Sequence, residues 1–210
     1  MHPNPSFRGT DHAASLAFVR NRGFGVLAVS SDAGAPMLSH VPFLLSEDGA
    51  AADLHLVRSN PICRTLGEGR AATLAVLGPD GYVSPDWYGV EDQVPTWNYV
   101  AVHLTGRLLP RPADEIDALL VRQSADFEAR LAPKRPWTMD KMTEETRARF
   151  LRMILPVRLE IASLESTWKL NQNKPDAVRH AATERVEDGF GQELAALAAL
   201  MRTPPSATGG

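Results

Sequence analysis

The feature that most constrains the fold of this 210-residue chain is a series of short segments in which apolar and polar residues alternate. Such alternation places one face of an extended strand against a core and leaves the other face polar. The segments are bounded by turn-forming residues and cover 25–30, 37–46, 53–59, 71–79, 96–109 and 157–164. The dipeptide Asp80-Gly81 predicts a tight hairpin leading to a further short strand at 82–84. About six or seven antiparallel strands indicate a small closed or half-open barrel.

Helical patterns occupy only a few places between these strands. Residues 11–22 and 112–131 have the apolar spacing of an amphipathic helix. A helix at 143–153 is indicated by Thr143 followed by two glutamates in the first turn, and a final helix is expected at 185–201. Because helices and strands do not alternate regularly, a doubly wound parallel sheet is not expected. The pattern predicts a mainly β fold of the α+β class, with a helical insert over about 112–153.

The composition describes an ordinary globular protein, with 44% hydrophobic and 22% charged residues. A formal net charge of −3 argues against broad electrostatic binding to nucleic acid, although a local basic patch is compatible with it. Cys63 is the only cysteine, so no intramolecular disulfide is expected. No signal-peptide pattern and no long apolar run is present, and we expect a soluble, cytoplasmic protein without a membrane association.

The strand at 96–109 has two unlike faces. Val100, Val102 and Leu104 form an apolar face, whereas Trp97, Tyr99, His103 and Arg107 form the other. The second face is too polar for a core and too aromatic for a solvent-exposed surface, and it suits a ligand or a partner. A dimer interface without a ligand fits this stretch equally well. Asn98 falls on the core side, where a lone amide needs a hydrogen-bond partner.

Two further segments bring polar groups to strand ends. In "LVRSNP" (56–61), Arg58 could grip a phosphate in a bidentate manner, beside the hydrogen-bonding groups of Ser59 and Asn60. In "WKLNQNK" (168–174), two ammonium groups and three amides follow the last strand, and amides can bind the polar edge of a heteroaromatic ring. Both segments also fit a simpler interpretation, as a surface strand end and a loop that caps a strand.

Other common chemistries find little support. His40, His55 and His103 lie on expected strands, but no zinc-ligand spacing accompanies them, and no metal site is expected. The chain has no glycine-rich phosphate loop and no nucleophile elbow, and nothing around Cys63 marks a catalytic thiol. We therefore assign no catalytic residue from the sequence.

Several of these segments together resemble a known family. The blocks "SHVPFLL", "HLVRSNP", "YVSPDWYGVEDQVPTWNYVAVHLTG" and "WKLNQNK", in this order, look like those of the PaiB-type FMN-binding negative transcriptional regulators. The resemblance covers about residues 1–182, which would form an FMN-binding split-barrel domain. It leaves 183–201 as a C-terminal helical extension and 202–210 as a flexible tail. It implies a split β-barrel like that of the pyridoxamine-phosphate oxidases, usually a homodimer with FMN at the subunit interface.

The resemblance also implies roles for individual residues. Ser39, His40 and Val41 would lie along the isoalloxazine ring, and Arg58 and Asn60 would bind the ribityl phosphate. Trp97, Asn98 and Tyr99 would close the pocket, with the partner chain as one possible source. Lys169, Gln172, Asn173 and Lys174 would contact the phosphate or the polar edge of the ring.

The function implied is negative regulation of late-growth genes such as those for sporulation and protease production. Direct DNA contact is possible but has little support, because the basic residues of the helical insert are interleaved with acidic ones and no helix-turn-helix pattern is evident. A flavin-dependent oxidoreductase or flavin reductase is the main alternative, so whether the chain is an enzyme stays open. Haem binding or degradation is a further alternative.

Overall fold

The computed structural model describes residues 1–8 and 10–205. Its residues form two compact units. One unit is built from three separate stretches of the chain and the other from two. The terminal unit consists of Met1–Arg22, Ala75–His103 and Leu164–Gly210, and the central unit of Gly23–Leu74 and Leu104–Ser163. Three long strands contribute a part of their length to each unit: β4 (Arg70–Val83), β5 (Thr96–Pro110) and β6 (Ile154–Lys169).

The strands form one antiparallel arrangement in the order β1-β2-β3-β6-β5-β4-β7, and β1 also pairs with β4. The additional strands are β1 (Phe24–Val29), β2 (Met37–Leu45), β3 (Ala51–Val57) and the short β7 (Gly191–Gln192). The β1–β4 pairing closes the first six strands into a barrel, which removes exposed strand edges. The closed antiparallel barrel confirms the fold class predicted from the alternating segments.

The alternation explains the core of the central unit. In β3, Ala52, Leu54 and Leu56 are at most 2% exposed, whereas the residues between them are only half-buried or exposed. The register of β3 against β6 pairs Leu54 with Val157 and Ala52 with Leu159, so apolar side chains of both strands line the same interior. The helical insert follows β5 and contains α3 (Ile116–Ala129) and α4 (Glu144–Leu151). Both helices lie within the expected ranges 112–131 and 143–153.

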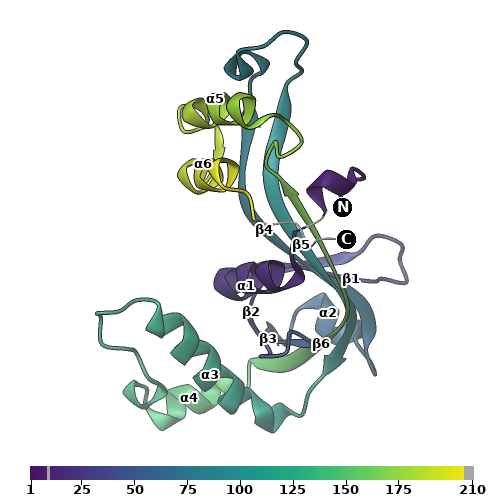
Figure 1. Ribbon diagram of the computed structural model, residues 1–210. Coiled ribbons are helices and arrows are strands. Elements are labelled where there is room, and N and C mark those ends of the chain that lie inside the picture. Colours follow the sequence, from purple (N-terminus) through teal and green to yellow (C-terminus); the bar gives the residue numbers. More distant parts are fainter. Residues whose placement is uncertain (9, 206–210) are drawn as a thin grey trace. The chain divides into compact units, whose positions relative to one another are not determined.

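The terminal unit has a second core. It is built around Trp168 and Leu170 at the end of β6, Tyr88, and the helices α1 (His12–Arg22), α5 (Asp176–Val186) and α6 (Leu194–Arg202). Figure 1 shows α5 and α6 packed side by side. The Trp168 indole donates a hydrogen bond to the Ser15 hydroxyl of α1, 3.3 Å away, so this buried N–H is satisfied. The helix expected at 11–22 is therefore confirmed.

The single helix predicted at 185–201 is wrong. The chain there forms the end of α5, the strand β7 and then α6. Gly191 has a φ of 154°, and a Cβ on it would lie 2.2 Å from the Asp80 carbonyl oxygen. The close pairing of β7 with β4 thus depends on this glycine and interrupts the helical pattern.

The hairpin predicted at Asp80-Gly81 is also wrong, because β4 continues through it to Val83. Asp80 and Gly81 pair with Gln192 and Gly191 of β7. A Cβ on Gly81 would lie 2.9 Å from the side chains of Leu194 and Leu197, so the glycine allows α6 to approach the strand. Its role is close packing and not a turn.

Residues 206–210 of the tail expected at 202–210 lie outside the described residues, and the division at residue 182 stays a prediction. In the described part of the chain, no helix has the length and apolar character needed to span a bilayer.

Candidate functional site

The predicted site residues fall into two groups, one in each unit. The central-unit group comprises Ser39, His40 and Val41 of β2 with Arg58 and Asn60 after β3. The terminal-unit group comprises Trp97, Asn98 and Tyr99 of β5 with Lys169, Gln172, Asn173 and Lys174 at and after the end of β6.

In the central-unit group, Asn60 joins two segments. Its Oδ1 accepts a hydrogen bond from the Ile62 backbone N–H at 3.0 Å and so caps the short helix α2 (Pro61–Thr65). Its Nδ2 donates to the Ser39 hydroxyl, 3.2 Å away on β2. Among the described residues the Ser39 O–H has no acceptor, so it can donate a hydrogen bond to a ligand. Asn60 positions Ser39, which is a role that the sequence did not indicate.

The Arg58 guanidinium is hydrogen-bonded to the protein through its Nε only, as far as the described residues go. Its Nε donates to the Arg152 carbonyl oxygen at 2.7 Å, and its backbone N–H donates to the Met153 carbonyl oxygen. Within the described residues its two terminal amino groups form no hydrogen bond or ion pair. This arrangement leaves an oriented, exposed cation that can bind an anion with two parallel hydrogen bonds.

The other two members of this group are placed differently from each other. The Val41 side chain is 2% exposed and belongs to the core, so only its backbone could contact a bound ring. His40 is exposed and stacks on Phe24 with ring centroids 6.5 Å apart and planes inclined at 25°. Its other face can receive a planar group.

In the terminal-unit group, β5 has the two faces predicted from the sequence. Val100, Val102 and Leu104 are at most 1% exposed, whereas Trp97 is 44% exposed and Tyr99 is half-buried. Asn98 lies on the core side and is fully buried, and neither its Oδ1 nor its Nδ2 has a partner among the described residues. An unsatisfied buried amide costs about 1–3 kcal/mol, which marks Asn98 as a candidate for a ligand or water contact.

Lys169 and Lys174 form the cationic part of this group. The Lys169 ammonium donates to the Thr96 hydroxyl, and the Lys174 ammonium donates to the Gln93 side-chain oxygen and lies 4.2 Å from the centre of the Tyr88 ring. In the part of the chain that the structure describes, neither forms an ion pair with a carboxylate. Burial lowers the pKa of Lys169, and the charge of Lys174 lowers it further. An anion bound here would relieve this repulsion.

The loop that carries these lysines is internally braced. Gln172 accepts from the Leu170 N–H at 2.8 Å and donates to the Trp168 carbonyl oxygen, so its amide is largely used within the loop. Asn173 is exposed. The predicted ligand contacts of both residues stay predictions.

Asn171 is a residue that the sequence reasoning missed. It is 2% exposed, has a φ of 62°, and donates a hydrogen bond to the Tyr88 hydroxyl at 3.0 Å. Burial raises the pKa of Tyr88, which this hydrogen bond partly opposes. Asn171 thereby fixes the ring beneath Lys174. An asparagine shortly after the end of β6 was the available signal, because asparagine tolerates the left-handed backbone conformation.

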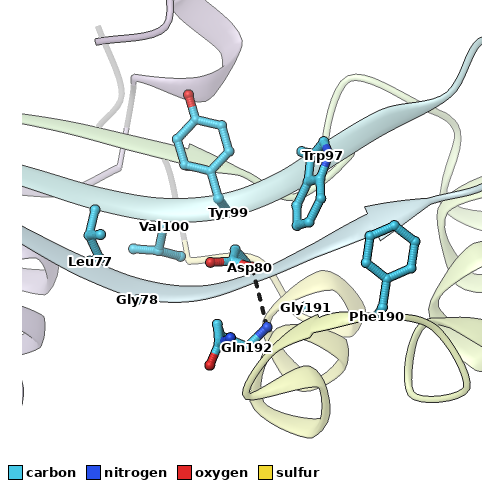
Figure 2. Close-up of a pocket in the computed structure, with 9 residues that line it drawn as sticks. All are labelled: Leu77, Gly78, Asp80, Trp97, Tyr99, Val100, Phe190, Gly191 and Gln192. Atoms are coloured by element: carbon cyan, nitrogen blue, oxygen red, sulfur yellow. Dashed lines mark hydrogen bonds between the residues drawn. The ribbon is translucent and has the colours of Figure 1, made fainter.

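A cleft lies beside Trp97 and Tyr99 in the terminal unit. It has a volume of about 530 Å³ and is lined by residues of β4, β5 and the segment 190–192. Figure 2 shows Trp97 and Phe190 together at one end of the cleft and Leu77 and Val100 at the other, with Asp80 between them. Phe190 and Asp80 were not among the predicted site residues.

Each group by itself offers part of what a phosphorylated planar ring requires. The oriented guanidinium of Arg58 in the central unit can bind a phosphate. The ammonium groups of Lys169 and Lys174 in the terminal unit, which have no carboxylate partner among the described residues, can do the same. The exposed aromatic ring of Trp97 can contact a planar group, whereas the orphaned amide of Asn98 lies on the buried face of the same strand. The residues therefore fit a flavin mononucleotide. No group of three or more histidine, cysteine, aspartate or glutamate side chains suited to a metal ion occurs in the described residues.

Comparison with known proteins gives a family match. Residues 1–163 match the family described as "Putative FMN-binding domain". The chain is 26% identical over 197 residues to the Bacillus subtilis protein "Protease synthase and sporulation protein PAI 2", and the match covers 93% of each protein. The family match, which ends at residue 163, includes the central-unit group and the residues Trp97, Asn98 and Tyr99. The match to the Bacillus subtilis protein is long enough to span the segment 169–174 as well.

Solved structures share the fold at low sequence identity. The FAD and heme binding protein of Mycobacterium smegmatis is 18% identical with a TM-score of 0.55, over 88% of this chain and 82% of that chain. The flavocytochrome Anf3 of Azotobacter vinelandii is 16% identical with a TM-score of 0.55, over 80% of this chain and 72% of that chain. At these identities the comparison shows a common architecture, the split barrel.

Proposed function

Because the chain belongs to the FMN-binding domain family, and FMN is therefore its cofactor, we propose that it is a cytoplasmic, homodimeric negative regulator of transcription. The observation that carries this proposal is the end-to-end similarity to the Bacillus subtilis protein named for protease synthesis and sporulation. The genes under its control would accordingly be late-growth genes of that kind.

In this proposal the central-unit group binds the flavin. Arg58 holds the phosphate with its two free amino groups, and Ser39 and Asn60 lie beside it. Ser39, His40 and the Val41 backbone line the isoalloxazine ring. When bound, FMN supplies reversible one- and two-electron chemistry, while the protein binds and orients it.

The terminal-unit group closes the pocket from the partner chain. Trp97, Asn98 and Tyr99 cover the ring, and Lys169 and Lys174 complete the charge around the phosphate or the polar ring edge, with Gln172 and Asn173 beside them. Support comes from the two features that are costly in an isolated chain, the orphaned amide of Asn98 and the adjacent ammonium groups.

Flavin titration of an Arg58→Ala variant tests the binding part. Loss of a charge-assisted hydrogen bond costs about 1.5–3 kcal/mol, so the FMN dissociation constant should rise by about 10- to 150-fold. Arg64→Ala is the matched control, because Arg64 is an exposed arginine of the neighbouring helix α2. Equal affinities of Arg58→Ala and wild type would remove Arg58 from the phosphate site.

Promoter binding tests the regulatory part. The FMN-loaded protein should bind the DNA upstream of its own gene, with an affinity that falls as salt rises. An FMN-loaded protein that ignores this DNA but oxidises NADH or NADPH in air would contradict direct regulation and support the oxidoreductase alternative.

A further inference from the structure

The cleft of the terminal unit has rigid aromatic walls. The rings of Tyr82 and Phe190 are stacked 5.3 Å apart, and the Trp97 ring meets Phe190 edge-on at 5.6 Å. Trp97 and Phe190 are nevertheless 44% and 61% exposed. The cleft volume of about 530 Å³ lies in the range of small-molecule sites, about 300–1,000 Å³.

Backbone pairing fixes one of these walls. The Phe190 carbonyl oxygen accepts a hydrogen bond from the Tyr82 N–H at 3.1 Å, and Gly191 pairs directly with Gly81. The wall is therefore built in advance and needs no ordering when a ligand binds, which lowers the entropic cost of binding.

The charge in the cleft is negative. Asp80 is the only ionisable acid or base among its lining residues apart from the Tyr99 phenol. In the described part of the chain, its side chain accepts one hydrogen bond, at Oδ1 from the Gln192 N–H 3.2 Å away. Within the described residues Asp80 has no ion-pair partner. The nearby cation Arg22, which donates to the Leu77 carbonyl oxygen, is already paired with Glu193 at 2.7 Å.

Aromatic walls and an unpaired carboxylate favour the same kind of ligand. The face of an indole ring attracts cations through its quadrupole. A carboxylate accepts hydrogen bonds from the N–H groups of a planar cation when the cation lies in the plane of the carboxylate. We propose that this cleft is a binding site for a planar aromatic cation, such as an aromatic amidine or a protonated nitrogen heterocycle. The site adjoins the proposed FMN contacts, because Trp97 and Tyr99 belong to both.

The test compares two probes of equal shape and opposite charge, 2-naphthamidine and 2-naphthoate. Their binding to the whole chain is measured by ligand-observed NMR titration, once without flavin and once with added FMN. The amidine should bind at least tenfold more tightly than the carboxylate. Equal binding of both probes would overturn the proposal. Binding of neither probe would also overturn it, and this is the result expected if a partner chain covers the cleft.

Variants assign the effect to the cleft. Asp80→Asn keeps the acceptor for Gln192 N–H but removes the charge, and it should weaken amidine binding about fivefold while leaving naphthoate binding unchanged or improved. Phe190→Leu should weaken both probes by about 2- to 10-fold. Asp92→Asn, a charge change outside the cleft, should leave both unchanged.

The FMN affinity of each protein is measured separately. Asp80→Asn should bind FMN like wild type, because Asp80 is not among the proposed FMN contacts. Loss of FMN binding in Asp80→Asn would show that the cleft is the flavin site and would overturn the proposal. A wild type that binds no FMN would instead contradict the proposed function, and the probe comparison on the flavin-free protein would still decide this proposal.

Discussion

At the scale of single residues, the buried polar groups carry the clearest consequences. His55 of β3 and Gln123 of α3 are an example, because His55 Nδ1 and Gln123 Nε2 have no partner among the described residues. Burial lowers the pKa of His55, and the neighbouring Gln123 side chain partly opposes this shift. The imidazole is therefore kept neutral where α3 packs on the barrel.

This predicts a pH dependence of stability with a defined sign. The unfolded chain binds a proton at His55 near its ordinary pKa of 6.5, whereas the folded chain binds it only at lower pH. The stabilisation is thus complete above pH 6.5 and is lost as the pH falls through the lower, folded-state pKa. The melting temperature of the wild type should therefore fall more between pH 8 and pH 5 than that of the double variant His55→Leu, Gln123→Leu, which has no imidazole at this position. Parallel pH profiles of the two proteins would show that His55 does not titrate in this way.

Asn98 predicts a conflict between stability and binding. Replacing it with leucine, which has a similar shape, removes two unsatisfied buried atoms, so the melting temperature in the absence of flavin should rise. The same change should weaken FMN binding by about 10-fold if the amide contacts the ring. Calorimetry and flavin titration of the same preparation check both effects. A less stable Asn98→Leu protein would mean that ordered water already satisfies the amide.

At the scale of elements, β7 depends on one glycine. In Gly191→Ala the new Cβ meets the Asp80 carbonyl oxygen and the backbone must leave a φ of 154°, so unfolding free energy should fall by more than about 2 kcal/mol. Gly89→Ala is the control, since Gly89 has a φ of 66° but open space around it, and it should cost about 1 kcal/mol. Urea unfolding compares the two. Similar losses in both would show that the β4–β7 pairing contributes little.

Sequence reasoning succeeded for elements whose pattern is local. Alternation placed Val100, Val102 and Leu104 in the core and located the six barrel strands, because a half-buried strand records its two environments in successive residues. It failed at Asp80-Gly81 and at 185–201, where the glycines serve contacts between segments more than a hundred residues apart. A glycine that makes room for a distant backbone has the same appearance in a sequence as a glycine that makes a turn.

The candidate site shows the same limit. Its residue type identified Arg58 as a possible anion ligand, and the family resemblance assigned Lys169 and Lys174 to the phosphate or the polar ring edge. That these cations have no carboxylate partner among the described residues is seen only in the structure. Tyr88, Asn171 and Phe190 were missed, because their contribution depends on contacts that only folding creates. The family resemblance assigned Val41 a contact with the isoalloxazine ring. Because its side chain is buried, only the backbone of Val41 could make that contact.

At the scale of the whole molecule, the proposed dimer makes the origin of each FMN contact testable. If one chain supplies Arg58 and its partner supplies Lys169 and Lys174, a homodimer of Arg58→Ala and a homodimer of Lys169→Ala, Lys174→Ala should both bind FMN weakly. A mixed dimer of the two variants contains one site with every cation intact and one site that lacks all three.

Co-expression with two affinity tags isolates this mixed dimer. We expect it to bind one FMN per dimer with wild-type affinity, since bidentate and ammonium contacts to the phosphate are restored together in the intact site. Sites assembled within a single chain would each keep one defect, so the mixed dimer would bind FMN as weakly as either parent. The stoichiometry of the tight phase therefore decides whether the aromatic and cationic face of β5 and β6 serves the flavin of the neighbouring chain.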